Sequence, residues 1–282
     1  MVESNQKIIC LLSDFGVRGS HYVASMKGII LKINPKVKII DISHYVSPYS
    51  FIEASFILKA TYKNFPKGTI FIIVVDPGVG SSREIVVIKT NSNYFFIGPN
   101  NGIFPNILDL NKISECIKIQ NEQYYNLPVS NTFHGRDIMA PVGAYISKNV
   151  VLSKFGTPFK PTDLIELPIE YKINEENKIV QGIIQYIDSF GNGVTNIPIK
   201  NNLIKNTNIL LNENINIQIL IKGNTYEGLF TSHFSRVPIK SLLFLIGSTG
   251  FLEISINQGD ASKELGFKVG DIIKIKLEED IC

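Results

Sequence analysis

The residues best suited to chemistry in this sequence lie in a glycine-rich loop at residues 76–83, DPGVGSSR. A near-continuous apolar run precedes the loop and is typical of a strand buried on both faces. Asp76 therefore stands at the carboxyl end of a predicted buried strand, where open α/β sheets place ligands. Because Gly78 and Gly80 allow tight backbone geometry, Arg83 can fold back over the loop. The alternative is a strand-ending turn with a solvated aspartate, since structural ion pairs have a similar pattern.

Three further polar clusters fall at the ends of predicted strands or in loops. They are Ser13 with Asp14, Asp41 with His44, and residues 133–136, FHGR. His134 comes just before a predicted helix at residues 138–146, and backbone N–H groups at a helix N-terminus favour negative charge. These clusters predict a polar site in the first half of the chain.

A metal-dependent hydrolase is one interpretation of these clusters. Asp14, Asp41, Asp76 and His134 offer carboxylate and imidazole ligands that suit a divalent cation. No two of them have a known short ligand spacing such as His-x-x-x-His, and so loose a match has a high false-positive rate. We therefore expect no metal site.

The common nucleotide and hydrolase motifs are missing from this sequence. The glycine-rich loop lacks the Lys-Ser/Thr ending of a phosphate-binding loop, and the first predicted strand ends in Asp-Phe-Gly instead of G-x-G-x-x-G. There is no G-x-S-x-G elbow either. The residue types favour a ligand with hydroxyl groups, and Asp14 can accept hydrogen bonds from both hydroxyls of a ribose.

Two loops in the second half of the chain could bind the rest of such a ligand. The first, YIDSFGN, offers the Asp188 carboxylate, the Phe190 ring and the Asn192 amide. The second, GSTG at residues 247–250, offers a hydroxyl turn before an edge-like strand. An Asn amide can pair with an adenine edge, an aromatic ring can stack on its face, and Asp188 could meet an ammonium group. Taken singly, each loop is also explained by ordinary turn chemistry.

The predicted elements bring the clusters of the first half together. Strands are predicted at 7–13, 37–42 and 69–75, helices at 21–33 and 51–62, and a hairpin of short strands at 85–89 and 94–97. Strand, helix, strand, helix, strand is the signature of a parallel sheet with right-handed crossovers. We therefore expect an N-terminal α/β domain.

The pattern changes after residue 157. We expect an N-terminal domain at 1–157, a proline-containing linker at 158–177 and a C-terminal domain at 178–282. Short β-like runs in that last part suggest a small sandwich or barrel. The predicted runs are 178–187, 207–211, 215–221, 225–230, 242–246, 251–256 and 272–277.

Composition excludes several classes of protein. With 282 residues, 44% of them hydrophobic and 19% charged, the chain can bury a sizeable core and fits a soluble globular protein. No apolar run approaches the ~18–20 residues of a membrane span. The polar N-terminus shows no secretion signal, and a net charge of +3 with dispersed lysines is too weak for a nucleic-acid surface. Three isolated cysteines fit a reducing cytoplasm, so we expect a cytoplasmic protein without nucleic-acid or membrane partners.

Seven strings give the sequence a specific resemblance. In order they are LLSDFG (11–16), MKGII (26–30), VVDPGVGSSR (74–83), GPNNGIF (98–104), TFHGRD (132–137), DSFGNGVTNI (188–197) and GSTGFLEISIN (247–257). Together they resemble the S-adenosyl-L-methionine (SAM) hydroxide adenosyltransferase family, the relatives of the fluorinating and chlorinating SAM enzymes. The resemblance covers nearly the whole chain. It implies an N-terminal parallel-sheet (Rossmann-like) α/β domain and a smaller C-terminal β-barrel-like domain. It also implies a homotrimer, in which each substrate lies between one subunit's N-terminal domain and a neighbour's C-terminal domain.

The resemblance also implies roles for residues of the N-terminal domain. Asp76, Arg83 and His134 match the family's water-activating residues. Asp14 matches the ribose-binding aspartate, and Tyr49 matches an aromatic residue that packs against the methyl end of the substrate.

In the C-terminal domain, the resemblance implies a binding surface for the remainder of SAM. Asp188, Phe190 and Asn192 match the loop that recognises the amino-acid end and the adenine. Ser248, with Thr249 beside it, matches the hydroxyl turn that holds the methionine carboxylate.

Three more residues match adenine-binding positions, Phe234 with a looser spacing. Phe234 resembles the aromatic residue that stacks on adenine, whereas Glu253 and Asn257 lie where the adenine is bordered largely by backbone. Residues 17–21 depart from the family pattern, because relatives often have an acidic residue there. The contacts of that loop stay open.

Three features favour water over halide as the nucleophile. Halide-using relatives have an aromatic or apolar residue in place of Asp76, and fluorinating ones have a serine in place of Gly135. Fluorinating relatives also carry a long insertion where this chain has only a short turn at residues 90–93. The predicted reaction is attack of water on the ribose C5′ of SAM, giving adenosine and L-methionine, with SAM as substrate and no cofactor.

A SAM-dependent halogenase and a non-catalytic SAM- or adenosine-binding protein are the alternatives. The sequence leaves open which sulfonium epimer is preferred, including the non-physiological (R) epimer. It also leaves open whether Asp76 or His134 accepts the proton.

Overall fold

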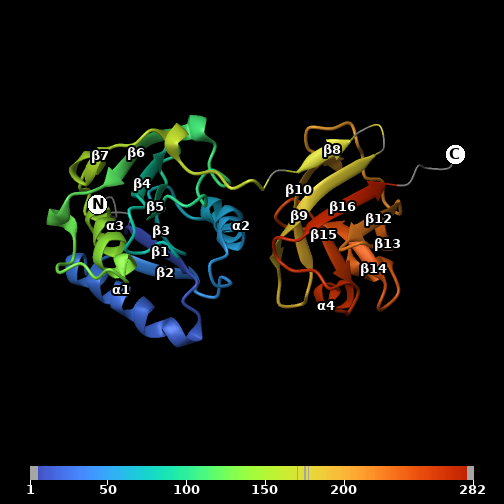
Figure 1. Cartoon of the computed structure of the whole chain (residues 1–282), viewed down its shortest axis with the longest axis horizontal. Coiled ribbons are helices and arrows are strands. Elements are labelled where there is room, and N and C mark those ends of the chain that lie inside the picture. Colours follow the sequence, from blue (N-terminus) through green and yellow to red (C-terminus); the bar gives the residue numbers. More distant parts are fainter. Residues whose placement is uncertain (1–5, 170, 175, 177, 278–282) are drawn as a thin grey trace, which may run out of the picture. The chain divides into compact units, whose positions relative to one another are not determined.

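The computed structural model describes residues 6–169, 171–174, 176 and 178–277. The chain forms two compact units, Met1–Leu167 and Pro168–Cys282 (Figure 1). The division between them falls inside the segment 158–177 that we expected to be a linker. Residues 170, 175 and 177 of that segment, and 278–282 of the expected C-terminal domain, lie outside the described residues.

A seven-stranded mixed sheet forms the centre of the first unit. Its strands are β1 (Ile8–Ser13), β2 (Lys38–Ser43), β3 (Ile70–Val74), β4 (Ile85–Thr90), β5 (Phe95–Pro99), β6 (Ile113–Ile119) and β7 (Gly156–Pro158). They lie in the order β2-β1-β3-β5-β4-β6-β7. The first four of that order run parallel, which confirms the predicted parallel sheet. The predicted hairpin is the antiparallel pair β4–β5, and β6 and β7 extend the antiparallel side.

Helices cover both faces of this sheet, so the central strands are apolar on both sides. The helices are α1 (Ser20–Ile33), α2 (Phe51–Thr61) and α3 (Ala140–Ser147). Successive residues of a strand point to opposite faces. Ile9 and Leu11 therefore join α1 and α3 in one core, whereas Cys10 and Leu12 join α2 in the other (Figure 1).

Short helical turns connect these elements. They are the 3₁₀ helices η1 (Val17–Gly19), η2 (Tyr62–Asn64), η3 (Leu110–Lys112), η4 (Glu122–Tyr124), η6 (Leu152–Lys154) and η7 (Pro161–Asp163), and the π-helix η5 (Gly135–Met139). The π-helix runs directly into α3, so the helix predicted at 138–146 begins earlier than expected. His134 is its N-terminal cap residue.

A closed seven-stranded barrel forms the second unit. Its strands are β9 (Ile179–Ile187), β10 (Gly193–Lys200), β12 (Asn216–Ile221), β13 (Asn224–Phe230), β14 (Leu242–Ile246), β15 (Phe251–Ile256) and β16 (Ile272–Leu277). Around the barrel the order is β10-β15-β14-β13-β12-β16-β9, and the pairing of β9 with β10 closes it. The short strands β8 (Lys172–Asn174) and β11 (Leu203–Ile204), the 3₁₀ helix η8 (Phe234–Arg236) and the helix α4 (Ala261–Leu265) complete the unit. The expected barrel is confirmed.

Two details of the barrel differ from the sequence prediction. The prediction of a strand at 207–211 was wrong, because the only strand-like pairing of this segment within the described structure is an isolated bridge from Leu210 to Leu203. Strand β10 was not predicted, because Asn196 and Pro198 interrupt its apolar pattern. The side chain of Asn196 is buried with both ends hydrogen-bonded, its oxygen accepting from the Ile183 N–H. Pro198 lies at a register shift in the β10–β15 pairing, which is where a strand tolerates proline.

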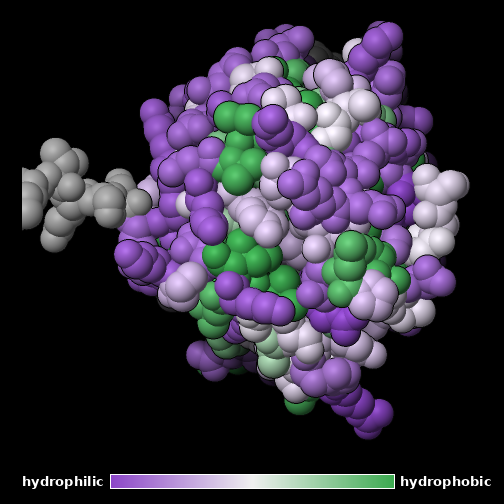
Figure 2. Space-filling model, turned by 90° about the vertical axis from the view of Figure 1, so that its left-hand side faces the viewer, coloured by the Kyte–Doolittle hydropathy of each residue, from purple (hydrophilic) through white to green (hydrophobic). Residues whose placement is uncertain are grey.

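One face of the described structure is mostly polar. Figure 2 shows one face on which hydrophilic residues predominate and hydrophobic ones form separate small patches. No described helix has the length and apolar character needed to span a membrane.

Candidate functional site

The loop after β3 holds an aspartate and an arginine in a two-point ion pair. Arg83 donates from Nε to Asp76 Oδ1 at 2.6 Å and from Nη2 to Asp76 Oδ2. Both side chains are largely buried, with 5% of Asp76 and 12% of Arg83 exposed. Gly80 has a φ of 81°, and a Cβ there would lie 2.4 Å from the Asn131 carbonyl oxygen. Only glycine therefore lets this loop pack closely enough to fold Arg83 back over Asp76.

His134 joins this pair from a segment far away in the sequence. Arg83 Nη2 lies 3.0 Å from His134 Nδ1. Because a guanidinium group only donates, Nδ1 accepts, and the neutral imidazole then carries its proton on Nε2. Burial lowers the pKa of His134 and the Arg83 charge lowers it further, against the opposing effect of Asp76 and Asp137. His134 is therefore neutral near pH 7.

Asp137 holds the segment that carries His134, a role that the sequence pattern did not predict. It is fully buried at the start of the π-helix. Its carboxylate accepts hydrogen bonds from Asn126 Nδ2 at 2.8 Å, from the Ser130 N–H at 2.9 Å and from the Arg136 guanidinium. Despite burial, these donors lower its pKa. The sequence feature that could have indicated this role is the charged pair Arg136 and Asp137, which directly precedes an apolar helical segment.

Asp14 and Tyr49 complete a pocket of about 360 Å³ in the first unit. The Asp14 carboxylate accepts from the Tyr49 N–H at 2.9 Å, and burial followed by the charge of Asp76 raises its pKa against that hydrogen bond. Tyr49 has a positive φ of 65° and is 67% exposed. Asp14, Tyr49, Asp76 and His134 all line this pocket. Arg83 is not among the lining residues, but it contacts both Asp76 and His134.

Asp41, the fourth residue considered for a metal site, lies elsewhere. It pairs with Lys27 at 2.5 Å and with His44 Nε2 at 3.1 Å, and these three residues line a separate pocket of about 550 Å³. His44 in turn contacts Ser13 Oγ through Nδ1 at 2.7 Å. Within the described ranges, no three His, Cys, Asp or Glu side chains are grouped to hold a metal ion.

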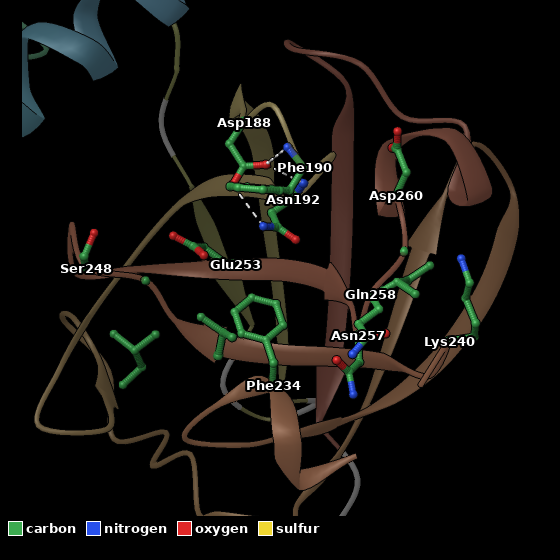
Figure 3. A pocket seen from close by; sticks show the side chains of 15 residues that line it. Asp188, Phe190, Asn192, Phe234, Lys240, Ser248, Glu253, Asn257, Gln258 and Asp260 are labelled. Atoms are coloured by element: carbon green, nitrogen blue, oxygen red, sulfur yellow. Dashed lines mark hydrogen bonds between the residues drawn. The ribbon is translucent and has the colours of Figure 1, made fainter. Parts of the chain in front are cut away.

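The second unit contains a pocket of about 890 Å³ (Figure 3). Seven of the eight residues expected to bind substrate in this unit line it: Asp188, Phe190, Asn192, Phe234, Ser248, Glu253 and Asn257. The eighth, Thr249, is not among its lining residues, and its buried hydroxyl has no hydrogen-bond partner in the described structure. The structure therefore brings together all but one of this set.

The Asp188 loop presents an aromatic ring to the pocket. Asp188 Oδ1 accepts from the N–H groups of Phe190 and Asn192, and Oδ2 accepts from Asn192 Nδ2, all at 2.9 Å (Figure 3). These bonds fix the turn and leave the Phe190 ring 74% exposed. A tight turn with an exposed ring suits stacking on a flat ligand.

Two other lining residues differ in their hydrogen bonding: the side chain of Asn257 has a partner within the protein, and that of Glu253 has none among the described residues. The Asn257 amide is buried and donates to the Val237 carbonyl at 2.8 Å, so it holds the turn next to Phe234. The carboxylate of Glu253 has no hydrogen bond or ion pair with any described residue. Burial, followed by the charge of Asp188, raises its pKa to about 7.

The sequence of this chain is similar to those of several known proteins. Two family models match, described as the N-terminal domain of SAM hydroxide adenosyltransferase over residues 9–156 and its C-terminal domain over residues 182–274. The chain is 37% identical to an (R)-S-adenosyl-L-methionine hydrolase of Methanocaldococcus jannaschii, with 95% of each chain covered. A hydrolase of the same name from Thermus thermophilus is 26% identical over 95% of this chain and 98% of the relative. A fluorinase from Actinopolyspora mzabensis is 21% identical over 96% and 97%.

A solved structure has the same fold over nearly the whole chain. It is an uncharacterized conserved protein from Thermotoga maritima, with a TM-score of 0.85 and 34% sequence identity. The alignment covers 95% of this chain and 99% of that protein.

Proposed function

This chain belongs to the SAM hydroxide adenosyltransferase family, and from that premise we propose that it is an enzyme that hydrolyses SAM to adenosine and L-methionine. The similar hydrolases are 26–37% identical over most of the chain, whereas the fluorinases are more distant, at 21–24%. Because those hydrolases are named for the (R) epimer of SAM, we also propose that this chain prefers the (R) sulfonium.

The single observation that carries this function is the partly buried group Asp76–Arg83–His134, of which Asp76 and His134 line a pocket. In the reaction, the oxygen of a water molecule forms a bond to the ribose C5′, and the C5′–S bond breaks. Its electron pair goes to sulfur, so methionine leaves as a neutral thioether and needs no proton. The water loses one proton. Catalysis therefore consists of holding and activating a weak nucleophile in line with the sulfonium.

We propose that Asp76 orients the water and accepts its proton. The reason is that the Nδ1 lone pair of His134 already accepts from Arg83, which leaves an Nε2–H donor on the neutral ring. His134 can then donate to the water oxygen and orient it. Arg83, which contacts both side chains but does not line the pocket, acts as a positioning residue. The negative charge of Asp76 also complements the positive sulfur of the substrate.

The remaining site residues are proposed to bind SAM in two pockets. Asp14 accepts from the ribose hydroxyls, and Tyr49 packs at the methyl end. In the other pocket, Asp188 and Ser248 hold the amino-acid end, with Thr249 beside them in the turn. The rings of Phe190 and Phe234, together with Asn192 and Asn257, enclose the adenine.

We further propose a homotrimer in which the first unit of one copy and the second unit of a neighbouring copy share each active site. The support is chemical: the groups that can activate water lie in one unit, and the pocket with two aromatic rings lies in the other. A cytoplasmic location also remains a proposal, which the free buried thiols of Cys10 and Cys116 support.

The backbone at Gly135 supports water over fluoride as the nucleophile, because the fluorinating relatives have a serine at this position. A Cβ at this position would lie 3.0 Å from Val74 Cγ1 and 3.4 Å from Met26 Sδ. A serine there would crowd its neighbours, so the position suits glycine in this chain.

A product assay with each SAM epimer tests the proposed function. Purified protein is incubated with each epimer, with and without chloride or fluoride, and the products are separated by chromatography. We expect adenosine and methionine in equal amounts, independent of halide and faster from the (R) epimer. A 5′-halo product would indicate a halogenase. Binding without any product would indicate a non-catalytic SAM-binding protein.

A further inference from the structure

Three carboxylates line the pocket of the second unit, those of Asp188, Glu253 and Asp260, and among them only the Glu253 carboxylate has no hydrogen bond or ion pair with a described residue. Asp188 already accepts three hydrogen bonds from its own loop. A carboxylate offers about four lone-pair sites, so Asp188 has little capacity left. The carboxylate of Glu253 makes no hydrogen bond or ion pair with any residue that the structure describes. All of its acceptor sites are therefore available.

Glu253 points to the end of the pocket that contains the hydroxyl turn. A Cβ at Gly247 would lie 1.7 Å from Glu253 Oε1, so the carboxylate packs directly on the backbone beside Ser248. In Figure 3, Glu253 lies between Ser248 and Asp188, while Asn257 and Lys240 lie on the other side of Phe234. The resemblance suggested an adenine border for Glu253, but its carboxylate is next to the proposed amino-acid end.

The unfavourable free energy of a partly buried, unpaired carboxylate at Glu253 points to a cationic ligand. A partly buried carboxylate without a partner is unfavourable, and the like charge of Asp188 adds to the cost. The other charged residues that line the pocket are Lys240 and Asp260. Lys240 pairs with Glu264 at 3.9 Å and Asp260 with Lys263 at 2.7 Å. No described cation therefore neutralises Glu253, and the bound ligand is the natural source of one.

We propose that Glu253 binds the α-ammonium group of the methionine moiety of SAM, opposite Asp188, and so selects adenosyl ligands that carry an amino acid. This inference rests on the proposed function, because it assumes that SAM occupies this pocket. The two carboxylates together balance the ammonium and sulfonium charges. The Ser248 turn beside them remains available for the α-carboxylate.

The test compares Glu253→Gln with wild type on ligands that do not react. Calorimetry at pH 8 measures the affinity for S-adenosyl-L-homocysteine, its analogue without the α-amino group, and 5′-methylthioadenosine, which lacks the amino acid. We expect the variant to bind S-adenosyl-L-homocysteine at least about tenfold more weakly. Affinity for the other two ligands is expected to stay within about twofold, because neither has an ammonium group to lose.

Two controls separate this effect from a general loss of structure. Glu122→Gln makes the same change at a surface position of the first unit and is expected to leave all three affinities unchanged. Glu253→Gln itself is expected to unfold at no lower temperature than wild type at pH 8, because it removes a partly buried charge without a partner.

Three results would overturn the inference. They are an unchanged affinity for S-adenosyl-L-homocysteine, an equal loss for all three ligands, or an equal loss for the desamino analogue. An equal loss that includes 5′-methylthioadenosine would place Glu253 at the adenine. If wild type binds S-adenosyl-L-homocysteine but forms no adenosine from SAM, the proposed reaction fails while the role of Glu253 stands. If wild type binds none of the ligands, both fail.

Discussion

At the scale of single residues, Arg83 determines what its two neighbours can do. Its guanidinium donates to both oxygens of Asp76 and to Nδ1 of His134. It therefore holds the carboxylate in one orientation and the imidazole in one tautomer. Since Arg83 is not among the residues that line the pocket, its contribution is to fix the two groups that are.

Changing Asp76 tests the proposed proton acceptor. Asp76→Asn keeps the size of the side chain but removes its basicity. We expect turnover of SAM to fall by about 10²–10⁴-fold, the usual contribution of a general base, with little change in affinity for S-adenosyl-L-homocysteine. Single-turnover kinetics and calorimetry measure the two quantities. Asp109→Asn, an exposed aspartate of the same unit, is the matched control. Loss of affinity with unchanged turnover would contradict the assigned role.

The lowered pKa of His134 predicts the acidic side of the pH profile. Protonation removes the lone pair that accepts from Arg83 and places two cations side by side. Activity is therefore expected to be full above the pKa of His134 and to fall as the pH drops through it, with a midpoint below the ordinary value of 6.5. A profile of kcat/KM from pH 4.5 to 9 measures this midpoint. A midpoint above 6.5 assigned to His134 would contradict the proposed contact.

At the scale of elements, the π-helix η5 brings His134 to Asp76 and Arg83. Its buried Asp137 accepts from a side chain, a backbone N–H and a guanidinium, and so it joins residues 126–130 to the helix. The position of His134 depends on this hydrogen-bonded anchor.

Removing Asp137 is therefore expected to destabilise the first unit. Asp137→Ala leaves the Asn126 amide, the Ser130 N–H and the Arg136 guanidinium without their acceptor. We expect the free energy of unfolding to fall by about 3 kcal/mol or more, as for a broken buried ion pair. Chemical denaturation measures this change, and Asp163→Ala, at a surface turn of the same unit, serves as control. A decrease below about 1 kcal/mol would show that Asp137 is not an anchor.

The elements also show where prediction from sequence succeeds. Strands β1 and β3 are continuous apolar runs, and the glycines after β3 predicted that Arg83 could return to Asp76. Strand β10 could not be predicted, because Asn196 is satisfied only by partners distant in sequence. The contact between Arg83 and His134 spans 51 positions and depends on a π-helix with no sequence signature. The resemblance named Thr249 as a binding residue, but its hydroxyl is buried away from the pocket lining.

At the scale of the whole molecule, the proposed trimer makes the active site a property of two copies. A symmetric ring of three copies has three equivalent interfaces, each joining different surfaces of two neighbours. The proposal predicts a particle with three times the 31.5 kDa mass of one chain, which analytical ultracentrifugation measures.

Mixed trimers test whether a site is shared between copies. Asp76→Ala disables the first unit, and Phe234→Ala weakens the second by removing a stacking ring. When the two variants are co-expressed in equal amounts, random assembly gives about one quarter of the sites two intact halves. Activity at low SAM should then rise to about a quarter of the wild-type value. If each site lay within one chain, no intact site would form and activity would stay at the level of the separate variants.

The most direct test of the central claim is to follow the oxygen atom. Purified protein is incubated with SAM in ¹⁸O-labelled water, and the products are analysed by mass spectrometry with fragmentation. Attack of water on C5′ predicts one ¹⁸O at the 5′ oxygen of adenosine and none in methionine, with or without halide. Unlabelled adenosine, a label in methionine, or a 5′-halo product in place of adenosine would contradict the account.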